Sequence, residues 1–268
     1  MKIGIYLRNM GPNATRATLR ECAQAADALP IDDLWVFDHI AIPREESEGS
    51  GGLYVDPLGT LAFLAGVTER IAIGTGVLVL PYRPALLVAK WAASIQVLSG
   101  GRLQLGVGIG WMESEFRALG VPRSRRGALS DEALELLHRC FADDEVETNG
   151  QRFLFLPRPA RPPIYVGGSG EHALRRAASL GDGWMPARKE PPELEEPIRT
   201  LRNLARAAGK APPEVVVSMR MAGLGDAELR ERIVAYGEVG VSRVAFNFPY
   251  EDTDGFRRTA ERIPGLLT

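Results

Sequence analysis

The chain has little cysteine, lysine and histidine, no excess of charge of one sign and no long apolar run. Its two cysteines, Cys22 and Cys140, lie far apart without metal-binding or redox spacing, so we expect reduced, buried thiols in a cytoplasmic protein. The formal net charge of −2 argues against a nucleic-acid partner or an anionic membrane surface. No apolar run reaches the roughly 18 residues of a membrane span, and Met1-Lys2 leads into a predicted strand rather than a signal peptide.

The dinucleotide-binding fingerprint is also missing. Gly106, Gly108 and Gly110 alternate singly, so the spacing G-x-G-x-x-G is not met, and no acidic residue ends a second strand about 20 residues further on. These glycines therefore do not form a Rossmann phosphate loop. They end a short apolar strand, where bare backbone lets a flat or bulky group approach closely; a tight turn that needs glycine is the alternative.

What the sequence does contain is a regular alternation of short apolar strands with helix-like segments. The predicted strands are 3–7, 34–37, 71–80, 102–107, 164–166, 183–185, 214–219 and 243–248. No change of composition marks a domain boundary between them, so we predict a single domain over residues 1–268. With right-handed crossovers, eight such units close most naturally into a (β/α)8 TIM barrel, and a doubly wound open sheet is the main alternative.

An insertion is expected between the fourth and fifth of these βα units. The pair Asn149-Gly150 between β-prone arms predicts a β-hairpin over residues 146–156. Before it, residues 130–141 form a predicted amphipathic helix with Ser130 as N-cap. The loop that precedes this helix carries three arginines, Arg123, Arg125 and Arg126.

In a barrel of this kind, the loops after the C-terminal ends of the strands form the active-site face. These ends are Arg8-Asn9, Asp38-His39, Gly74-Thr75-Gly76, Gly108-Ile109-Gly110-Trp111, Gly167-Gly168-Ser169-Gly170, Trp184-Met185-Pro186, Arg220 and Asn247-Phe248-Pro249. They contain no obvious nucleophile–base pair and no carboxylate cluster suited to a metal, so we predict no metal site. Such a rim suits a flat cofactor held by backbone contacts better than a hydrolytic site.

Two strand ends carry more specific hypotheses. Gly167-Gly168-Ser169-Gly170 opens a helix, whose free N–H groups and dipole could hold a phosphate; a plain turn with Ser169 as N-cap is the alternative. His39 follows Asp38, and a histidine at the mouth of a barrel favours a functional over a purely structural role. Of the other histidines, His138 is interpreted as structural or solvated, and His172 could be either.

Several segments, in conserved order along the chain, resemble the bacterial luciferase-like family of flavin and deazaflavin oxidoreductases. They are LWVFDHI (34–40), RIAIGTGVL (70–78), LSGGR through GIGW (98–111), EFRALGV (115–121), PIYVGGS (163–169) and AASLGDGW (177–184). The resemblance covers about residues 1 to 190. Within the family, the SGGR and GW versions look most like the branch that uses coenzyme F420, a deazaflavin.

The resemblance implies a barrel that binds a flavin-type ring at its C-terminal mouth. By position, His39 and Asp38 would be the catalytic residues beside the ring and the transferred hydride. The residues implied to bind the cofactor are Thr75, Gly76 and Val77 behind the ring, Gly108, Gly110 and Trp111 at its border, and Gly167, Gly168, Ser169, Gly170 and Pro186 around the phosphate. The family often has a non-prolyl cis bond at the bulge of the third strand, and Gly76-Val77 is the candidate here.

One position departs from the family pattern. Some deazaflavin members have a glutamate where this chain has Trp111, and without that acid His39 becomes the better residue for proton transfer. The resemblance also implies a homodimer, which is the commonest symmetric oligomer. Residues 42–55, a glycine-rich loop that follows His39, are the predicted lid.

Three functions remain open on these grounds. The first is an oxidoreductase that moves a hydride between reduced coenzyme F420 and a small organic substrate. The second is an FMN-dependent monooxygenase supplied with reduced flavin by a partner reductase. The third is a non-catalytic barrel that binds a ligand, because a fold does not fix a function. The three arginines at 123, 125 and 126 favour the first, since the glutamyl tail of the deazaflavin is polyanionic.

Overall fold

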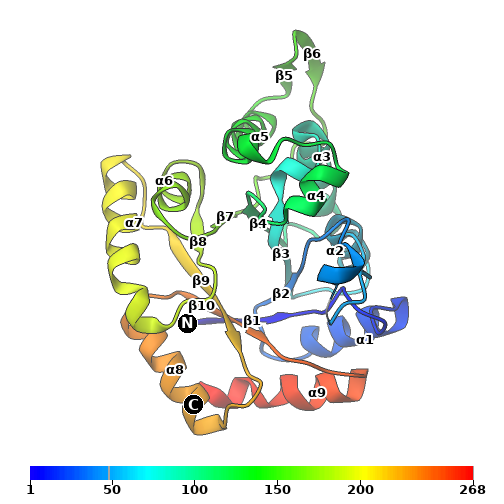
Figure 1. Ribbon diagram of the computed structural model, residues 1–268, viewed down its shortest axis with the longest axis vertical. Coiled ribbons are helices and arrows are strands. Elements are labelled where there is room, and N and C mark those ends of the chain that lie inside the picture. The colour runs from blue at the N-terminus through cyan, green and yellow to red at the C-terminus, as the bar shows by residue number, and fades with distance from the viewer. Residues whose placement is uncertain (48, 268) are drawn as a thin grey trace.

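The computed structural model describes residues 1–47 and 49–267, which form a closed barrel of eight parallel strands surrounded by helices (Figure 1). Around the barrel the strand order is β1-β10-β9-β8-β7-β4-β3-β2. The strands are β1 (Lys2–Tyr6), β2 (Asp33–Val36), β3 (Ala72–Val79), β4 (Leu103–Gly108), β7 (Ile164–Gly167), β8 (Gly183–Met185), β9 (Glu214–Arg220) and β10 (Arg243–Asn247). The predicted TIM barrel is confirmed, and its closure rules out the open sheet.

Helices connect the strands and cover the outside of the barrel. They are α1 (Arg16–Asp27), α2 (Pro57–Ala65), α3 (Ala85–Leu98), α4 (Glu113–Ala118), α5 (Arg126–Ala142), α6 (Glu171–Leu180), α7 (Glu195–Ala207), α8 (Asp226–Glu238) and α9 (Thr253–Arg262). In the part of the chain that the structure describes, no helix is long and apolar enough to cross a membrane.

The predicted hairpin is confirmed as a separate antiparallel pair, β5 (Glu145–Thr148) and β6 (Gln151–Leu154). Asn149 and Gly150 form its two-residue turn with φ values of 50° and 73°. Positive φ at both turn residues matches the right-handed twist of the two strands, which explains the Asn-Gly pair. The hairpin projects away from the barrel beyond α5 (Figure 1).

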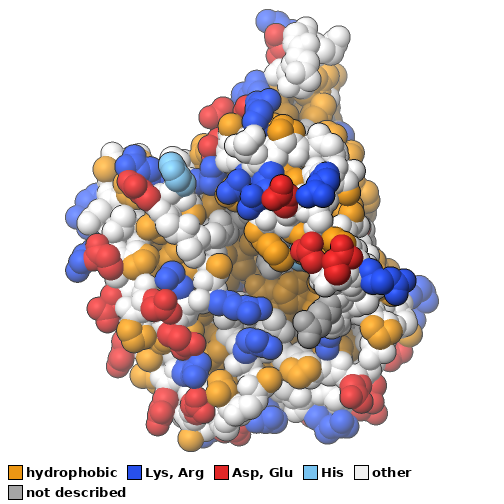
Figure 2. Space-filling view, in the orientation of Figure 1, with side chains coloured by type: hydrophobic (Ala, Val, Ile, Leu, Met, Phe, Trp, Pro, Cys, Tyr) orange, Lys and Arg blue, Asp and Glu red, His pale blue; other side chains and the backbone are white. Residues whose placement is uncertain are grey.

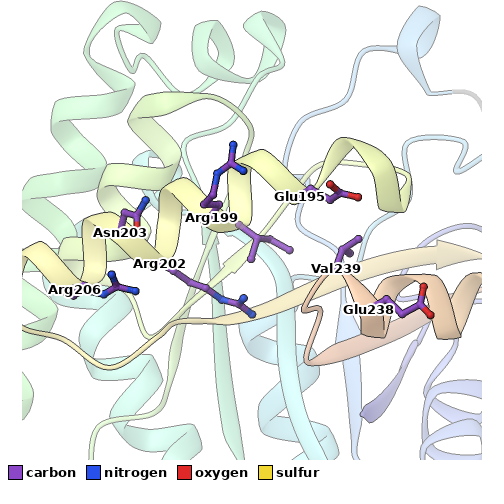
Figure 3. A pocket seen from close by; sticks show the side chains of 8 residues that line it. Glu195, Arg199, Arg202, Asn203, Arg206, Glu238 and Val239 are labelled. Atoms are coloured by element: carbon purple, nitrogen blue, oxygen red, sulfur yellow. The ribbon is translucent and has the colours of Figure 1, made fainter.

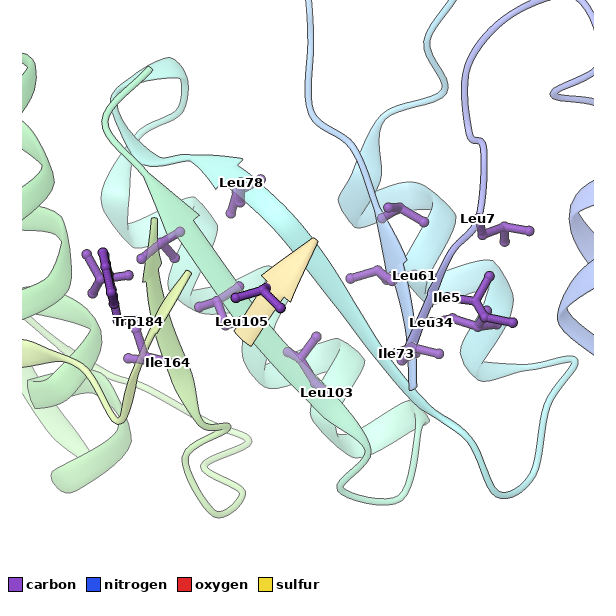
Figure 4. Close-up of a cluster of buried hydrophobic side chains, with 14 of the residues drawn as sticks. Ile5, Leu7, Leu34, Leu61, Ile73, Leu78, Leu103, Leu105, Ile164 and Trp184 are labelled. Carbon is purple, nitrogen blue, oxygen red and sulfur yellow. The ribbon is translucent and has the colours of Figure 1, made fainter. Parts of the chain in front are cut away.

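The main hydrophobic core lies between the outer surface of the strands and the helices. Ile5, Leu34, Ile73 and Leu105 come from four different strands and contribute to this core together with Leu61 of α2 (Figure 4). Parallel strands are covered on both faces, which is why they read as nearly continuous apolar runs in the sequence. Cys22 and Cys140 are both buried in the same core and form no disulfide, as expected.

A second set of side chains fills the inside of the barrel. Alternate residues of each strand point inwards, so the filling is arranged in layers. One part of the filling is the buried ion pair between Arg243 and Asp33. Another is a cluster of buried side chains formed by Tyr6, Trp35, Tyr165, Met185, Val216 and Ala245. Residues two positions further along each strand therefore reach the mouth of the barrel.

The start of α5 differs from the sequence prediction. The helix begins at Arg126 rather than at residue 130, and Arg123–Arg125 forms a short 3-10 turn (η3) instead of an irregular loop. Ser130 is buried inside the helix, where its hydroxyl donates to the Arg126 carbonyl at 2.8 Å, so its prediction as N-cap is wrong. A serine that bonds back to the carbonyl four residues earlier is compatible with a helix interior, and arginine and alanine favour helix formation.

Candidate active site

A cavity of about 480 Å³ lies at the C-terminal ends of β2, β3, β4, β7 and β8. Its lining combines apolar side chains with bare backbone: Phe37, Asp38, His39, Gly76, Val77, Val79, Tyr82, Gly108, Ile109, Gly110, Trp111, Gly167, Gly168 and Ala187. Figure 2 shows an apolar hollow near the middle of the molecular face, below α4. The volume falls within the roughly 300–1,000 Å³ of typical small-molecule and cofactor pockets.

Strand β3 provides the part of the wall that carries Val77. Its pairing with β4 shifts register between Thr75 and Leu78, and the peptide bond Gly76–Val77 is cis, as the family resemblance implied. A Cβ atom added at Gly108 would lie 2.6 Å from Cγ2 of Val77, and one added at Gly167 would lie 2.9 Å from Cγ1. Both neighbouring strands therefore need glycine where the Val77 side chain stands in the cavity wall.

Four residues predicted to bind the cofactor lie outside this lining. Thr75 is fully buried beneath the bulge, and its hydroxyl donates to the Gly106 carbonyl at 2.6 Å. Pro186 is buried directly after β8, whereas Ser169 and Gly170 are exposed in front of α6. The other predicted residues, from Gly76 to Gly168, are brought together around one cavity.

His39 forms a hydrogen bond with a carboxylate that sequence reasoning did not assign to the site. Its Nδ1 lies 2.9 Å from Oε2 of Glu115, which is fully buried and also accepts a hydrogen bond from the Tyr82 hydroxyl at 2.9 Å. The other oxygen, Oε1, accepts the backbone N–H groups of Ile40 at 2.5 Å and Ala41 at 3.0 Å. Burial raises the pKa of Glu115, but these hydrogen bonds outweigh it and lower the pKa to about 2.

An ionised carboxylate at Nδ1 requires that this nitrogen carries a hydrogen, which leaves Nε2 for a molecule in the cavity. The His39 side chain is 20% exposed and lines the cavity. Its ring lies 5.0 Å from that of Tyr54 and 6.2 Å from that of Trp111, centre to centre. Trp111 itself is 65% exposed at the rim. His39 is therefore held in one tautomer and flanked by aromatic rings.

Asp38 has both carboxylate oxygens engaged by other groups. Arg83 donates to Oδ1 and Oδ2 at 2.8 and 2.7 Å, and the backbone N–H of Val79 donates to Oδ2 at 2.8 Å. Arg83 also donates to Asp56 at 2.7 Å. Burial raises the pKa of Asp38, and the bonds from Arg83 and Val79 act against this rise. The arrangement fixes the end of β2, and with it the start of the segment that carries His39.

The glycine loop after β7 leads into the N-terminus of α6. The N-cap is Gly170, with φ of 89°, so the alternative with Ser169 as N-cap is wrong. Gly168 has φ of 117°, and its carbonyl accepts a hydrogen bond from Trp184 Nε1 at 2.8 Å, which fixes the loop. No described side chain caps the first turn of α6, so its N-terminal N–H groups face the loop region uncapped.

The residues that sequence analysis missed come from two other segments. Tyr82 ends the 3-10 turn η2 (Leu80–Tyr82) after β3, Arg83 follows it, and Glu115 lies in α4. Glu115 stands in one of the matching segments, but its separation of 76 residues from His39 carries no periodic signal. The predicted lid, 42–55, includes position 48, which lies outside the described residues; elsewhere in this segment, Arg44–Glu46 forms a 3-10 turn (η1) and Tyr54 bridges to Met10.

Another cavity of about 480 Å³ lies on the outside of the barrel, beside α7 and α8 (Figure 3). It is lined by Glu195, Ile198, Arg199, Arg202, Asn203, Arg206, Glu238 and Val239. None of these residues follows the C-terminal end of a strand, and none belongs to the predicted site. The cavity at the mouth is therefore the candidate active site.

A closed barrel whose mouth joins a glycine-lined apolar cavity to a carboxylate-bound histidine has the form of an enzyme site suited to a flat cofactor. Comparison with known proteins identifies the family. The chain belongs to the luciferase-like monooxygenase family, whose family model matches residues 1–262. The resemblance deduced from the sequence segments is thus confirmed.

Two relatives illustrate the similarity. An uncharacterised protein of Mycobacterium tuberculosis is 35% identical over 209 residues, which cover 71% of this chain and 72% of the relative. The F420-dependent hydroxymycolic acid dehydrogenase of the same organism is 31% identical over 201 residues, covering 71% of this chain and 54% of that enzyme.

Solved structures share the fold at lower identity. A monooxygenase from Streptomyces bottropensis has a TM-score of 0.84 at 22% identity, covering 100% of this chain and 98% of the other. An F420-dependent secondary alcohol dehydrogenase in complex with an F420–acetone adduct has a TM-score of 0.83 at 18% identity, covering 100% and 99%. Riboflavin lyase with modified FMN has a TM-score of 0.67 at 17% identity, covering 89% and 66%. At these identities, the solved structures show that the fold is shared.

Proposed function

We propose that this oxidoreductase transfers a hydride between reduced coenzyme F420 and a small organic substrate. The observation that carries the proposal is the His39–Glu115 pair at the wall of a largely apolar cavity. When bound, the reduced deazaflavin supplies the hydride, and it has carbon in place of the ring nitrogen through which flavins react with oxygen. The similarity to an F420-dependent dehydrogenase supports the same choice.

His39 is the proposed acid–base residue. Hydride transfer to a carbonyl carbon leaves negative charge on the oxygen, and a proton donor within hydrogen-bond distance lowers the barrier. His39 delivers this proton from Nε2, while the Glu115 carboxylate at Nδ1 holds the ring in its orientation. In the reverse direction Nε2 accepts the proton. We assign Asp38 a positioning role, because Arg83 and Val79 engage both of its oxygens.

The glycines and Val77 fit a flat ring in the cavity. Gly76, Gly108 and Gly110 present backbone where a Cβ would lie 2.6–2.7 Å from Tyr6 Oη, Val77 Cγ2 or Val79 Cγ1. At these three positions the cavity is therefore bordered by backbone alone. The Val77 side chain is the apolar group that projects from this part of the wall. We propose that Val77 supports one face of the ring, that Trp111 borders it, and that Thr75 acts from beneath by fixing the bulge.

The cofactor phosphate is proposed to lie at the N-terminus of α6, held by the glycine loop 167–170 beside Pro186. Uncapped N–H groups and the helix dipole favour an anion there. The positive φ values of Gly168 and Gly170 let the loop backbone turn towards a ligand at no steric cost. Half-buried Arg126 has a buried Nε without a hydrogen-bond partner among the described residues, and it is a candidate contact for the polyanionic tail.

The test is equilibrium binding of coenzyme F420 and of FMN to the purified protein, side by side, by quenching of cofactor fluorescence. We expect tighter binding of F420, weakened at least about tenfold by Ser169→Asp because the added carboxylate repels the phosphate. Ser179→Asp places the same charge near the far end of α6 and is expected to change the affinity less than about twofold. Both variants should keep the thermal midpoint of the parent protein within a few degrees.

The opposite outcomes are equally informative. Tighter binding of FMN would replace the proposal by an FMN-dependent monooxygenase, the function that the similarity to a Streptomyces monooxygenase supports. That reading requires a partner reductase, and oxygen consumption with chemically reduced FMN would test it. Failure to bind either cofactor would contradict both proposed enzyme functions, the F420-dependent and the FMN-dependent one. It would favour a non-catalytic barrel that binds another ligand.

A further inference from the structure

The mouth of the barrel divides into two halves of different chemistry. The cavity described above occupies the ends of β2, β3, β4, β7 and β8, and its side chains are largely apolar. The ends of β9, β10 and β1 carry Arg220, Asn247 and Arg8 instead. Building on the proposed function, we propose that this basic half is a subsite for an anionic group, so that the substrate is a small organic carboxylate or phosphate ester.

The strand register places these three side chains at the mouth. Tyr6, Val216 and Ala245 belong to one cluster of buried side chains inside the barrel. Arg8 lies two residues beyond Tyr6, Asn247 two beyond Ala245 and Arg220 four beyond Val216, so all three share the inward-facing rows. Asn247 and Arg220 are direct neighbours across β10 and β9, and β1 pairs with the other edge of β10. Arg8, Asn247 and Arg220 therefore follow or end three adjacent strands, and we refer to these three residues as the arc.

The positive charges of this arc are not neutralised within the described residues. No described carboxylate pairs with Arg8 or Arg220, whereas Arg83, Arg161 and Arg243 all form ion pairs. The two carboxylates nearest the catalytic histidine, Asp38 and Glu115, are buried and satisfied by their own partners. A guanidinium group without a carboxylate at the mouth of a cavity is suited to bidentate binding of a carboxylate or phosphate.

A third arginine extends the arc towards the cofactor cavity. Arg188 follows Ala187, which belongs to the lining of the cofactor cavity. Arg188, Ser218 and Arg220 line a neighbouring cavity of about 230 Å³, whose lining also includes Glu190. The Glu190 carboxylate forms an ion pair with Arg232. Figure 2 shows basic side chains bordering the lower left of the apolar hollow. A ligand that spans the boundary would meet an apolar wall on one side and arginines on the other.

Arg8 connects this subsite to the catalytic histidine. Its guanidinium carbon lies 6.0 Å from the centre of the Tyr250 ring, and its backbone N–H donates to the Tyr250 hydroxyl at 2.9 Å, which fixes the residue. Burial raises the pKa of Tyr54, whose ring lies 5.0 Å from that of His39, and the positive charge of Arg8 acts against this rise. An anion held at Arg8 would direct the remainder of a small substrate towards Tyr54, whose ring neighbours that of His39.

The competing assignment is that these arginines hold the cofactor phosphate or tail. The proposed phosphate site lies at the end of β7, and β8 separates it from β9 in the barrel order. The two assignments differ in what an arginine variant should lose. In the cofactor assignment it loses affinity for F420, and in the substrate assignment it loses only the preference for anionic ligands.

The test uses benzoate, phenyl phosphate and uncharged benzamide, titrated by calorimetry into the F420-loaded protein. We expect at least one anion to bind about tenfold or more tightly than benzamide, as charge-assisted bonds to arginine imply. Arg220→Gln and Arg8→Gln should each remove most of this preference while benzamide affinity changes less than about twofold. Arg8→Lys, which keeps the charge, should retain part of it. Arg206→Gln, a charge-matched control in the outer cavity beside α7, should behave like the parent protein.

The result that overturns the inference is equal affinity of the parent protein for the anions and for benzamide. Loss of F420 affinity in Arg8→Gln or Arg220→Gln, with the anion preference intact, would assign the arc to the cofactor instead. If the parent protein does not bind F420, the proposed function fails. The same titrations into the cofactor-free protein then decide whether the anion subsite exists on its own.

Discussion

His39 Nδ1 lies 2.9 Å from Oε2 of Glu115, and this contact joins the end of β2 to the short helix α4. Glu115 is followed by Phe116, whose buried ring packs edge-on against Tyr82 with 5.1 Å between ring centres. Tyr82 in turn donates to the same carboxylate oxygen. The carboxylate is thus held from several sides, and the orientation of His39 is fixed before any ligand binds.

The first prediction concerns the tautomer of His39. Glu115→Gln should abolish the strict preference for hydrogen on Nδ1, because an amide can either accept from or donate to this nitrogen. Long-range proton–nitrogen NMR spectra of the histidine rings, of which the chain has three, will show this change directly. We expect kcat to fall by about tenfold to a hundredfold, part of what a positioned acid–base group contributes, with KM little changed.

Tyr82→Phe serves as the graded control for that experiment. It removes one donor to Glu115 and leaves the contact between the carboxylate and His39 in place. We expect the Nδ1–H tautomer to persist and kcat to fall by less than about tenfold. If Glu115→Gln leaves both the tautomer and kcat unchanged, the carboxylate has no positioning role.

The second prediction is that Glu115 makes the free energy of unfolding decrease as the pH becomes acidic. Its folded-state pKa of about 2 lies below the ordinary value of 4.5, so the carboxylate stabilises the folded protein above pH 4.5. This contribution should be lost progressively as the pH falls from about 4.5 to about 2. Urea unfolding of the parent protein and of Glu115→Gln should therefore differ most near neutral pH and converge in acid. A constant difference across this range would contradict the assignment.

The third prediction concerns the ion pair between Arg83 and Asp38. Arg83→Gln leaves a buried carboxylate without its cation, and we expect the free energy of unfolding to fall by roughly 3–5 kcal/mol. The double variant Arg83→Gln with Asp38→Asn should recover a large part of this loss, because no unpaired charge remains. Urea midpoints of the two single variants and the double variant provide the measurement. A loss below about 1 kcal/mol in Arg83→Gln would show that the pair is not important for stability.

The fourth prediction uses the contact between Gly108 and Val77. Gly108→Ala places a methyl group 2.6 Å from Cγ2 of Val77 and must displace this side chain from the cavity wall. We expect cofactor affinity to fall by about tenfold or more, because the apolar support of the ring is lost. The matched control is Gly59→Ala in α2, where an added Cβ meets nothing within 4 Å. Its cofactor affinity should equal that of the parent protein.

Much of this architecture is determined by the sequence. Apolar strand runs such as Ile71–Ile73 and Leu103–Val107, each followed by a helix-like segment, predict parallel βα units, because each strand must be buried on both faces. Asn149-Gly150 predicts the hairpin for a local reason, since both residues tolerate positive φ. Glycines at strand ends also predicted the mouth of the cavity, because glycine marks in the sequence the positions that have no side chain.

Other features depend on contacts between distant segments and could be found only in the structure. Ser130 has the chemistry of an N-cap, yet packing of α5 extends the helix by a turn before it. The pairing of His39 with Glu115 has no local signature, because nothing near either residue specifies the other. The same holds for Arg83 and Asp38, and for the arc of Arg8, Asn247 and Arg220.

The sequence by itself determined the strand–helix order, the turn chemistry and the strand ends that carry functional residues. These depend on periodicity and on backbone conformations that neighbouring residues decide. Only the tertiary structure decided which carboxylates are buried, which cations they neutralise and which arginines are left at the mouth. Burial and pairing of charge arise when closure of the barrel brings together residues such as His39 and Glu115, 76 positions apart in the chain.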